Sequence, residues 1–155
     1  MSRSLSTRRD LLIVAHMVPL IPPPSHTVFY HGDEGKSRSD DFMARNGLPY
    51  ARLDELLKRS LEGRYLYQQL IDTRRRWVEI EEVWWELSRR LARAASGDVW
   101  CFGPERDLQG GDAEQFRSRF VQTSYANTVF DKVELPELEL NPRVTRIYYN
   151  ERILN

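Results

Sequence analysis

Residues 72–103 read DTRRRWVEIEEVWWELSRRLARAASGDVWCFG, and this stretch decides the fold class. Its apolar side chains recur at intervals of three and four residues, which is the repeat of one face of an α-helix. They are Trp77, Ile80, Trp84, Leu87, Leu91 and Ala94. The opposite face carries glutamates early and arginines late, an order that suits the helix macrodipole. We therefore predict a long amphipathic helix over residues 72–96, capped by Asp72 or Thr73.

A short strand is predicted directly after this helix. Ser96-Gly97 supplies a helix stop, and residues 98–103 form an apolar run that ends before Pro104. A helix that feeds a buried strand is typical of a globular core. It does not by itself identify a function.

Length and composition predict one domain of the α+β class. The chain has 155 residues, 41% of them hydrophobic, which is enough for one sizeable core. We expect residues 1–10 to be a loose N-terminal arm and residues 11–155 to be the domain, with a mostly antiparallel sheet packed against the long helix. Cys101 is the single cysteine, so neither an intramolecular disulfide nor a cysteine-based zinc site is expected.

Charge and hydropathy argue against two classes of partner. Lys+Arg and Asp+Glu balance at 23 each, so no overall field points to nucleic acid. No apolar run approaches the ~20 residues of a membrane-spanning helix. Residues 6–18 resemble a twin-arginine export signal, but their apolar run is short and contains His16. We therefore expect a cytoplasmic protein.

The remaining elements follow from turn residues and periodicity. We expect strands at residues 11–18, 26–31, 116–123 and 143–149, the last closing the sheet. Short helices are expected from Ser39 to Asn46-Gly47 and over residues 53–61, the second stopped or kinked at Gly63. Residues 64–71 fit either a strand or a helix. Residues 129–140 alternate charged and apolar side chains around Pro136.

Most familiar catalytic motifs are missing from the sequence. It contains no G-x-S-x-G elbow, no P-loop, no G-x-G-x-x-G and no histidine pair at metal-ligand spacing. Cys101 lies in a predicted apolar strand, where burial would keep its thiol inert. We therefore expect no metal cofactor and no cysteine nucleophile.

One segment gives a chemical lead. Residues 27–32 read TVFYHG and precede a polar loop and a short helix. This pattern resembles the opening of ADP-ribosyltransferase folds of the His-Tyr-Glu class, which includes diphtheria toxin and the poly-ADP-ribose polymerases. The resemblance implies that His31 hydrogen-bonds a ribose hydroxyl of NAD and that the backbone of Gly32 bonds the nicotinamide amide. It covers about 20 of the 155 residues.

The same resemblance suggests the other members of an NAD site. A tyrosine that stacks on nicotinamide would be Tyr65 or Tyr67, and Trp77 or Trp84 would replace a second tyrosine. The glutamate that steadies an oxocarbenium-like ribose would be Glu134 or Glu137, and no motif chooses between them. The function implied is a small NAD-consuming enzyme, an ADP-ribosyltransferase or NAD glycohydrolase of the kind found as toxin or effector domains.

A second hypothesis is a non-catalytic interaction module. It would use exposed aromatic and arginine residues to hold a protein target or a second copy, and four aromatic residues are of the type that anchors such interfaces. They are Trp85, Tyr125, Tyr148 and Tyr149. A third option, nucleic-acid binding, would use the arginines at residues 74–76.

Overall fold

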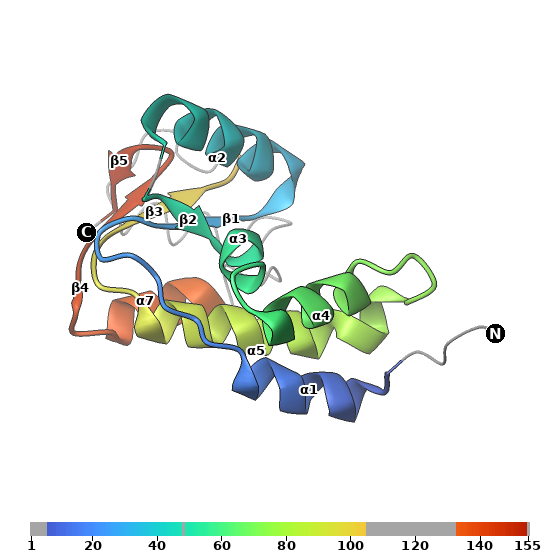
Figure 1. Ribbon diagram of the computed structural model, residues 1–155. Helices are drawn as coiled ribbons and strands as arrows, with labels where there is room; N and C mark the ends of the chain where they lie inside the picture. The colour runs from blue at the N-terminus through green and yellow to red at the C-terminus, as the bar shows by residue number, and fades with distance from the viewer. Residues whose placement is uncertain (1–5, 48, 105–132, 155) are drawn as a thin grey trace.

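The computed structural model describes residues 6–47, 49–104 and 133–154, and a five-stranded sheet runs through its centre (Figure 1). The strands are β1 (Thr27–Tyr30), β2 (Ala51–Arg52), β3 (Gly97–Phe102), β4 (Val144–Tyr149) and β5 (Arg152–Ile153). Their order across the sheet is β2-β1-β3-β4-β5.

Helices cover both faces of this sheet (Figure 1). They are α1 (Arg8–Met17), α2 (Gly32–Asn46), α3 (Leu53–Leu57), α4 (Leu61–Leu70), α5 (Trp77–Ala94) and α7 (Leu135–Leu140). Helix α2 packs on one face through Phe42, which contacts Val28 and Phe102. The larger core lies on the other face, where α1, α3, α4, α5 and α7 cluster against Phe29, Val99 and Ile147.

The predicted α+β class and single domain are confirmed, whereas the predicted antiparallel pairing is wrong. Strand β1 runs parallel to both β2 and β3, and β3 runs parallel to β4. Among the described strands, β4 and β5 form the antiparallel pair. The physical reason is that helices connect β1, β2, β3 and β4, and parallel neighbours require such long crossovers.

Helix α5 confirms the amphipathic helix but begins at Trp77, five residues later than predicted. Asp72 does not cap it, because its carboxylate accepts hydrogen bonds from the backbone and side chain of Arg74. The buried face of α5 consists of Ile80, Val83, Leu87, Ser88, Leu91 and Ala92. Trp77, which the repeat assigned to the core, is 55% exposed because it stands at the first turn, beyond the edge of that core.

The first apolar segment is a helix rather than a strand. Thr7 caps α1 through a hydrogen bond from the Asp10 backbone N–H to its Oγ1, and Leu11 and Ala15 are buried at helical spacing. Residues 8–10, which belong to the predicted N-terminal arm, form the first turn of α1. A short apolar run fits both structures, and here the cap and the packing of α1 on α4 and α5 favour the helix.

Residues 64–71, which the sequence left open, are helical up to Leu70. Ser60 caps α4 by accepting a hydrogen bond from the Gly63 backbone N–H. Gly63 neither stops nor kinks the helix; it lets the helix approach α3. A Cβ atom at this position would lie 1.9 Å from the carbonyl oxygen of Leu57.

Helix α2 confirms the predicted stop at Asn46-Gly47 but begins at Gly32, with His31 at the N-cap rather than Ser39. The predicted strand at residues 143–149 is β4, and it is followed by β5 instead of closing the sheet. Asn150 and Glu151 have φ angles of 47° and 68°, which is the backbone of a two-residue hairpin turn.

Two sequence expectations concern residues outside those that the structure describes, namely the strand at 116–123 and the start of the segment at 129–140. From Leu135 that segment is helix α7, with Pro136 in its first turn, where a missing N–H costs nothing. Within the described residues, none of the helices combines the length and apolar character that crossing a bilayer requires.

Stability should depend on the buried face of α5. Leu87 is fully buried, so Leu87→Ala should lower the free energy of unfolding by about 2 to 5 kcal/mol through lost contacts and a residual cavity. The matched control is Leu140→Ala on α7, because Leu140 is 80% exposed and should change stability by less than about 0.5 kcal/mol. Chemical denaturation measures both. Equal losses would contradict this assignment of the core.

Candidate functional site

A pocket of about 630 Å³ opens where β1 and β2 end. Parallel strands place their carboxyl ends at one edge of a sheet, and ligands of such sheets bind where the strand order reverses direction. In this sheet the reversal falls at β1, because the chain goes from β1 to β2 on one side and later returns to β3 on the other. The pocket therefore lies where the topology favours a ligand.

The lining comes from both the sheet and the helices of the larger core. It comprises Val28, Phe29, Tyr30, His31, Gly32, Lys36, Arg52, Leu53, Asp54, Tyr67, Ile71, Trp77, Glu81, Trp84, Trp85, Ser88 and Glu134. This set includes the histidine and the glycine that the resemblance names, together with one of its two candidate tyrosines and one of its two candidate glutamates. His31, Gly32, Tyr67 and Glu134 all line the pocket.

Tyr65 and Glu137 are not among these lining residues. Two positions along a helix differ by about 200° around its axis, so Tyr65 leaves α4 on a different side from Tyr67. The Tyr65 hydroxyl is hydrogen-bonded to Ser6 Oγ. Glu137 accepts hydrogen bonds from Arg93 Nε at 3.1 Å and Nη2 at 3.0 Å. The geometry therefore favours Tyr67 and Glu134 as site candidates.

Glu134 is a buried carboxyl group, with 6% of its surface exposed. Burial raises the pKa of Glu134 to about 8, although a hydrogen bond with Ser88 acts in the opposite direction. The side chain is therefore mostly protonated at neutral pH. A cationic ligand would favour its ionised form and lower that pKa.

The side chain of His31 contacts Tyr149 on β4. Its Nε2 atom lies 2.9 Å from the Tyr149 hydroxyl, and burial lowers the pKa of His31 to about 4, so the ring is neutral at physiological pH. Gly103 makes room for this pair. A Cβ at that position would lie 1.9 Å from Tyr149 Oη and 2.2 Å from His31 Nε2.

Aromatic side chains form the wall of the pocket that comes from α4 and α5. Tyr67, Trp84 and Trp85 are half-buried, and Trp77 stands more exposed. The sequence predicted Trp77 and Trp84 as core residues, with either of them as a substitute for the second tyrosine of an NAD site. It predicted that Trp85 faces a second core surface or a partner. All three line the pocket, and Trp84 also packs against the larger core.

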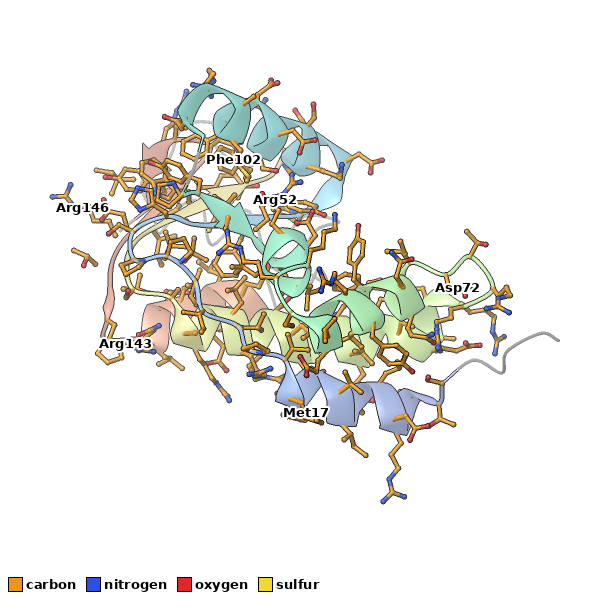
Figure 2. All side chains as sticks on the ribbon, viewed as in Figure 1. Met17, Arg52, Asp72, Phe102, Arg143 and Arg146 are labelled. Atoms are coloured by element: carbon orange, nitrogen blue, oxygen red, sulfur yellow. The ribbon has the colours of Figure 1, made fainter. Side chains whose placement is uncertain are left out.

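Arg52 is a site residue that the sequence gave no reason to select. It lies between α2 and α3 (Figure 2), with 11% of its side chain exposed. It forms ion pairs with Asp40, with Asp54 at 3.2 Å and with Glu55 at 3.5 Å. Its guanidinium also lies 5.2 Å from the ring centroid of Tyr30. The only sequence signal was the cluster of acids that follows Arg52 along the chain.

Two glycines shape the start of α2 beside the pocket. Gly32 has a φ of 71°, and a Cβ there would meet no atom within 4 Å, so the backbone is open to a ligand. A Cβ on Gly35 would lie 2.6 Å from the carbonyl oxygen of Phe102. Gly35 therefore allows α2 to pack closely on the end of β3.

Most of the aromatic residues and arginines on which the alternative hypotheses rest are buried or make contacts within the chain. Tyr148 stacks on Trp100 at 4.3 Å, Tyr149 is buried, and Tyr125 lies outside the described residues. The arginines at residues 74–76 each hydrogen-bond a nearby polar side chain, Asp72, Gln69 and Glu79 respectively. In the part of the chain that the structure describes, no three His, Cys, Asp or Glu residues gather as metal ligands would.

No protein-family model matches this chain, and no curated protein matches its sequence. Among solved structures, it is similar to Aplysia cyclase in complex with the substrate NGD and the product cGDPR, with 22% identity over 82% of this chain and a TM-score of 0.49. It is also similar to an ADP ribosyl cyclase in complex with N1-cIDPR, with 18% identity over 82% of this chain and a TM-score of 0.48. The chain covers 49% of each of these structures, about half their length.

The descriptions of these two structures name cyclases. The resemblance found in the sequence concerned a different group, the transferases of the His-Tyr-Glu class.

The buried Glu134 should make stability depend on pH. Its pKa is about 8 in the folded chain and about 4.5 in the unfolded chain, so unfolding releases a proton between these values and stability falls as pH rises. His31 acts in the opposite sense, but only below about pH 6.5, because its folded pKa is the lower one. Between pH 6.5 and 8 we expect Glu134 to lower the free energy of unfolding by up to about 1.4 kcal/mol per pH unit.

Denaturant titrations at several pH values in this window measure the slope. Glu134→Gln should remove Glu134's contribution to the slope, because an amide does not titrate. Glu137→Gln is the matched control and should keep the full slope, since Glu137 pairs with Arg93 at the surface. An unchanged slope in Glu134→Gln would show that this carboxyl group is not the buried titrating one.

Proposed function

We propose that this chain is a small NAD-consuming enzyme that breaks the bond between nicotinamide and ribose. The observation that carries the proposal is the convergence of His31, Gly32, Tyr67 and Glu134 on one pocket. These residues come from the N-terminal end of α2, from α4 and from the start of α7, and the sequence resemblance implies a site role for each of them. For the tyrosine the resemblance allows Tyr65 or Tyr67, and for the glutamate it allows Glu134 or Glu137.

The chemistry of the lining supports a cationic, planar group. Flat aromatic rings such as Tyr67, Trp84 and Trp85 attract organic cations as well as planar rings. Asp54, Glu81 and Glu134 add carboxyl groups to the same lining. The oxidised nicotinamide ring is both planar and positively charged. A volume of about 630 Å³ is within the range of small-molecule sites.

In the proposed reaction the C1′–N bond of the nicotinamide ribose breaks, and its electron pair goes to the departing nicotinamide. The ribose is left with oxocarbenium character and is captured by water or by another nucleophile. Ionised Glu134 would stabilise that cation electrostatically. A substrate cation would itself favour the ionised form, so that binding prepares the carboxylate for its role.

His31 and Gly32 have binding roles in this proposal. The neutral imidazole of His31 can exchange hydrogen bonds with a ribose hydroxyl, and its orientation is supported by Tyr149. Gly32 offers a backbone that no side chain shields, which suits a close contact to an amide. Both residues stand at the carboxyl end of β1, beside the switch point of the sheet.

Calorimetric titration with NAD and an assay of nicotinamide release test the proposal. His31→Ala should weaken NAD binding by about tenfold, the loss of one hydrogen bond to a neutral group. Glu134→Gln should reduce turnover by about a hundredfold or more while changing the affinity less, because its role is greatest in the transition state.

Two neighbours of these candidates serve as matched controls. Tyr65→Phe and Glu137→Gln alter the same residue types outside the pocket, and both variants should retain the affinity and the turnover of the unmodified protein. Absence of both NAD binding and nicotinamide release in the unmodified protein would overturn the proposal and favour an interaction module.

A further inference from the structure

We propose that Asn150 is a positioning residue for His31 and that it acts through the backbone of Gly103. This inference rests on the proposed function, in which His31 binds a ribose hydroxyl of NAD. Neither Asn150 nor Gly103 is among the described residues that line the pocket, so any effect of Asn150 on the ligand is indirect. Neither the sequence motifs nor the resemblance assigned a role to Asn150.

Asn150 is suited to the turn that follows β4. Its φ of 47° lies in the left-handed region, which asparagine adopts more readily than most residues other than glycine. Its backbone N–H donates a hydrogen bond to the carbonyl oxygen of Cys101 at 2.9 Å, one residue beyond the pairing of Tyr149 with Cys101. This bond keeps Asn150 beside the end of β3.

The side-chain amide of Asn150 pairs with Gly103 as a peptide group would. Its Nδ2 donates a hydrogen bond to the Gly103 carbonyl oxygen at 2.9 Å, and its Oδ1 accepts one from the Gly103 N–H at 3.0 Å. One side chain therefore satisfies both backbone polar groups of Gly103. Because the amide is planar and bonds both groups, it fixes the position and the orientation of this backbone.

The position of Gly103 determines the space that His31 occupies. The backbone N–H of His31 donates a hydrogen bond to the carbonyl oxygen of Phe102 at 3.0 Å, the residue before Gly103. A Cβ on Gly103 would lie 2.2 Å from His31 Nε2 and 1.9 Å from Tyr149 Oη, so the backbone packs closely on this pair. A small movement of Gly103 therefore displaces the imidazole ring or the hydroxyl that it contacts.

A fixed orientation matters for His31 because its ring offers a ribose hydroxyl a single hydrogen bond of defined direction. His31 is buried, with 6% of its surface exposed, and burial lowers its pKa to about 4. Binding groups of this kind depend on support from residues behind them. The Asn150 amide and the Tyr149 hydroxyl supply that support from β4 and its turn, on the side away from the ligand.

Calorimetric titration with NAD tests the proposal in a double-mutant cycle. Asn150→Gly permits the same left-handed turn but removes the amide, and it should weaken NAD binding by about threefold to tenfold. In a His31→Ala background the same substitution should change the affinity by less than about twofold, because the side chain that it positions is gone.

Glu151→Gly is the matched control for the turn. Glu151 has a φ of 68°, and its side chain pairs with Arg45 at the surface, 3.2 Å away. This variant introduces glycine beside Asn150 without removing the amide, so the affinity for NAD should not change. Should Asn150→Gly fail to fold, Asn150→Asp takes its place in the cycle, because it keeps the size of the side chain and removes the N–H donor.

NMR titration of the His31 ring without NAD gives a second measurement. The pKa should be about 4 in the unmodified chain and in Glu151→Gly, and it should rise toward 6.5 in Asn150→Gly as the ring gains access to water. A loss of stability alone would not shift this pKa, because the resonances of the folded chain are the ones followed.

The results distinguish the positioning role from the function on which it rests. An equal loss of affinity from Asn150→Gly with and without His31, no loss at all, or an unchanged pKa of His31 would overturn the role of Asn150 while leaving NAD binding intact. Absence of NAD binding in the unmodified chain would overturn the proposed function, and the NMR titration would then decide alone whether Asn150 positions the ring.

Discussion

Parallel pairing of β1 with both β2 and β3 is the constraint on which the rest of the structure depends. It requires long helical connections, which supply the layers on both faces of the sheet. It also brings the carboxyl ends of these strands to one edge, where His31, Gly32 and Arg52 stand beside the tryptophans of α5. The pocket is therefore a consequence of strand direction, since the residues that line it are far apart in the sequence.

The sequence predicted those parts of the fold in which the spacing of apolar residues along the chain indicates which side chains are buried. Helix α5 and strand β3 were identified because the repeat changes at Gly97, and β1 because it is a short apolar run. The same reasoning placed a strand at residues 11–18, where Thr7 instead caps a helix. Local patterns could not predict the relative direction of the strands, because it depends on the segments that connect them.

About half of the candidate site could be predicted from residues 27–32 and the resemblance that they carry. The choice between Tyr65 and Tyr67 required the knowledge that residues 61–70 are helical, which the sequence left open. The choice between Glu134 and Glu137 required tertiary structure, because only the folded chain buries Glu134 beside Ser88 and pairs Glu137 with Arg93. For Arg52 the only signal was the acids that follow it along the chain, since its partner Asp40 on α2 becomes a neighbour only after folding.

The contact between His31 and Tyr149 joins residues 118 positions apart. During synthesis on a ribosome, the imidazole therefore has no access to this hydroxyl until β4 has emerged, long after β1. Loop closure over such a separation is also slow compared with the formation of the helices. The nascent chain should thus acquire its helices early and this contact last, so that a prematurely terminated chain lacking β4 would lack the Tyr149 hydroxyl that bonds the His31 imidazole.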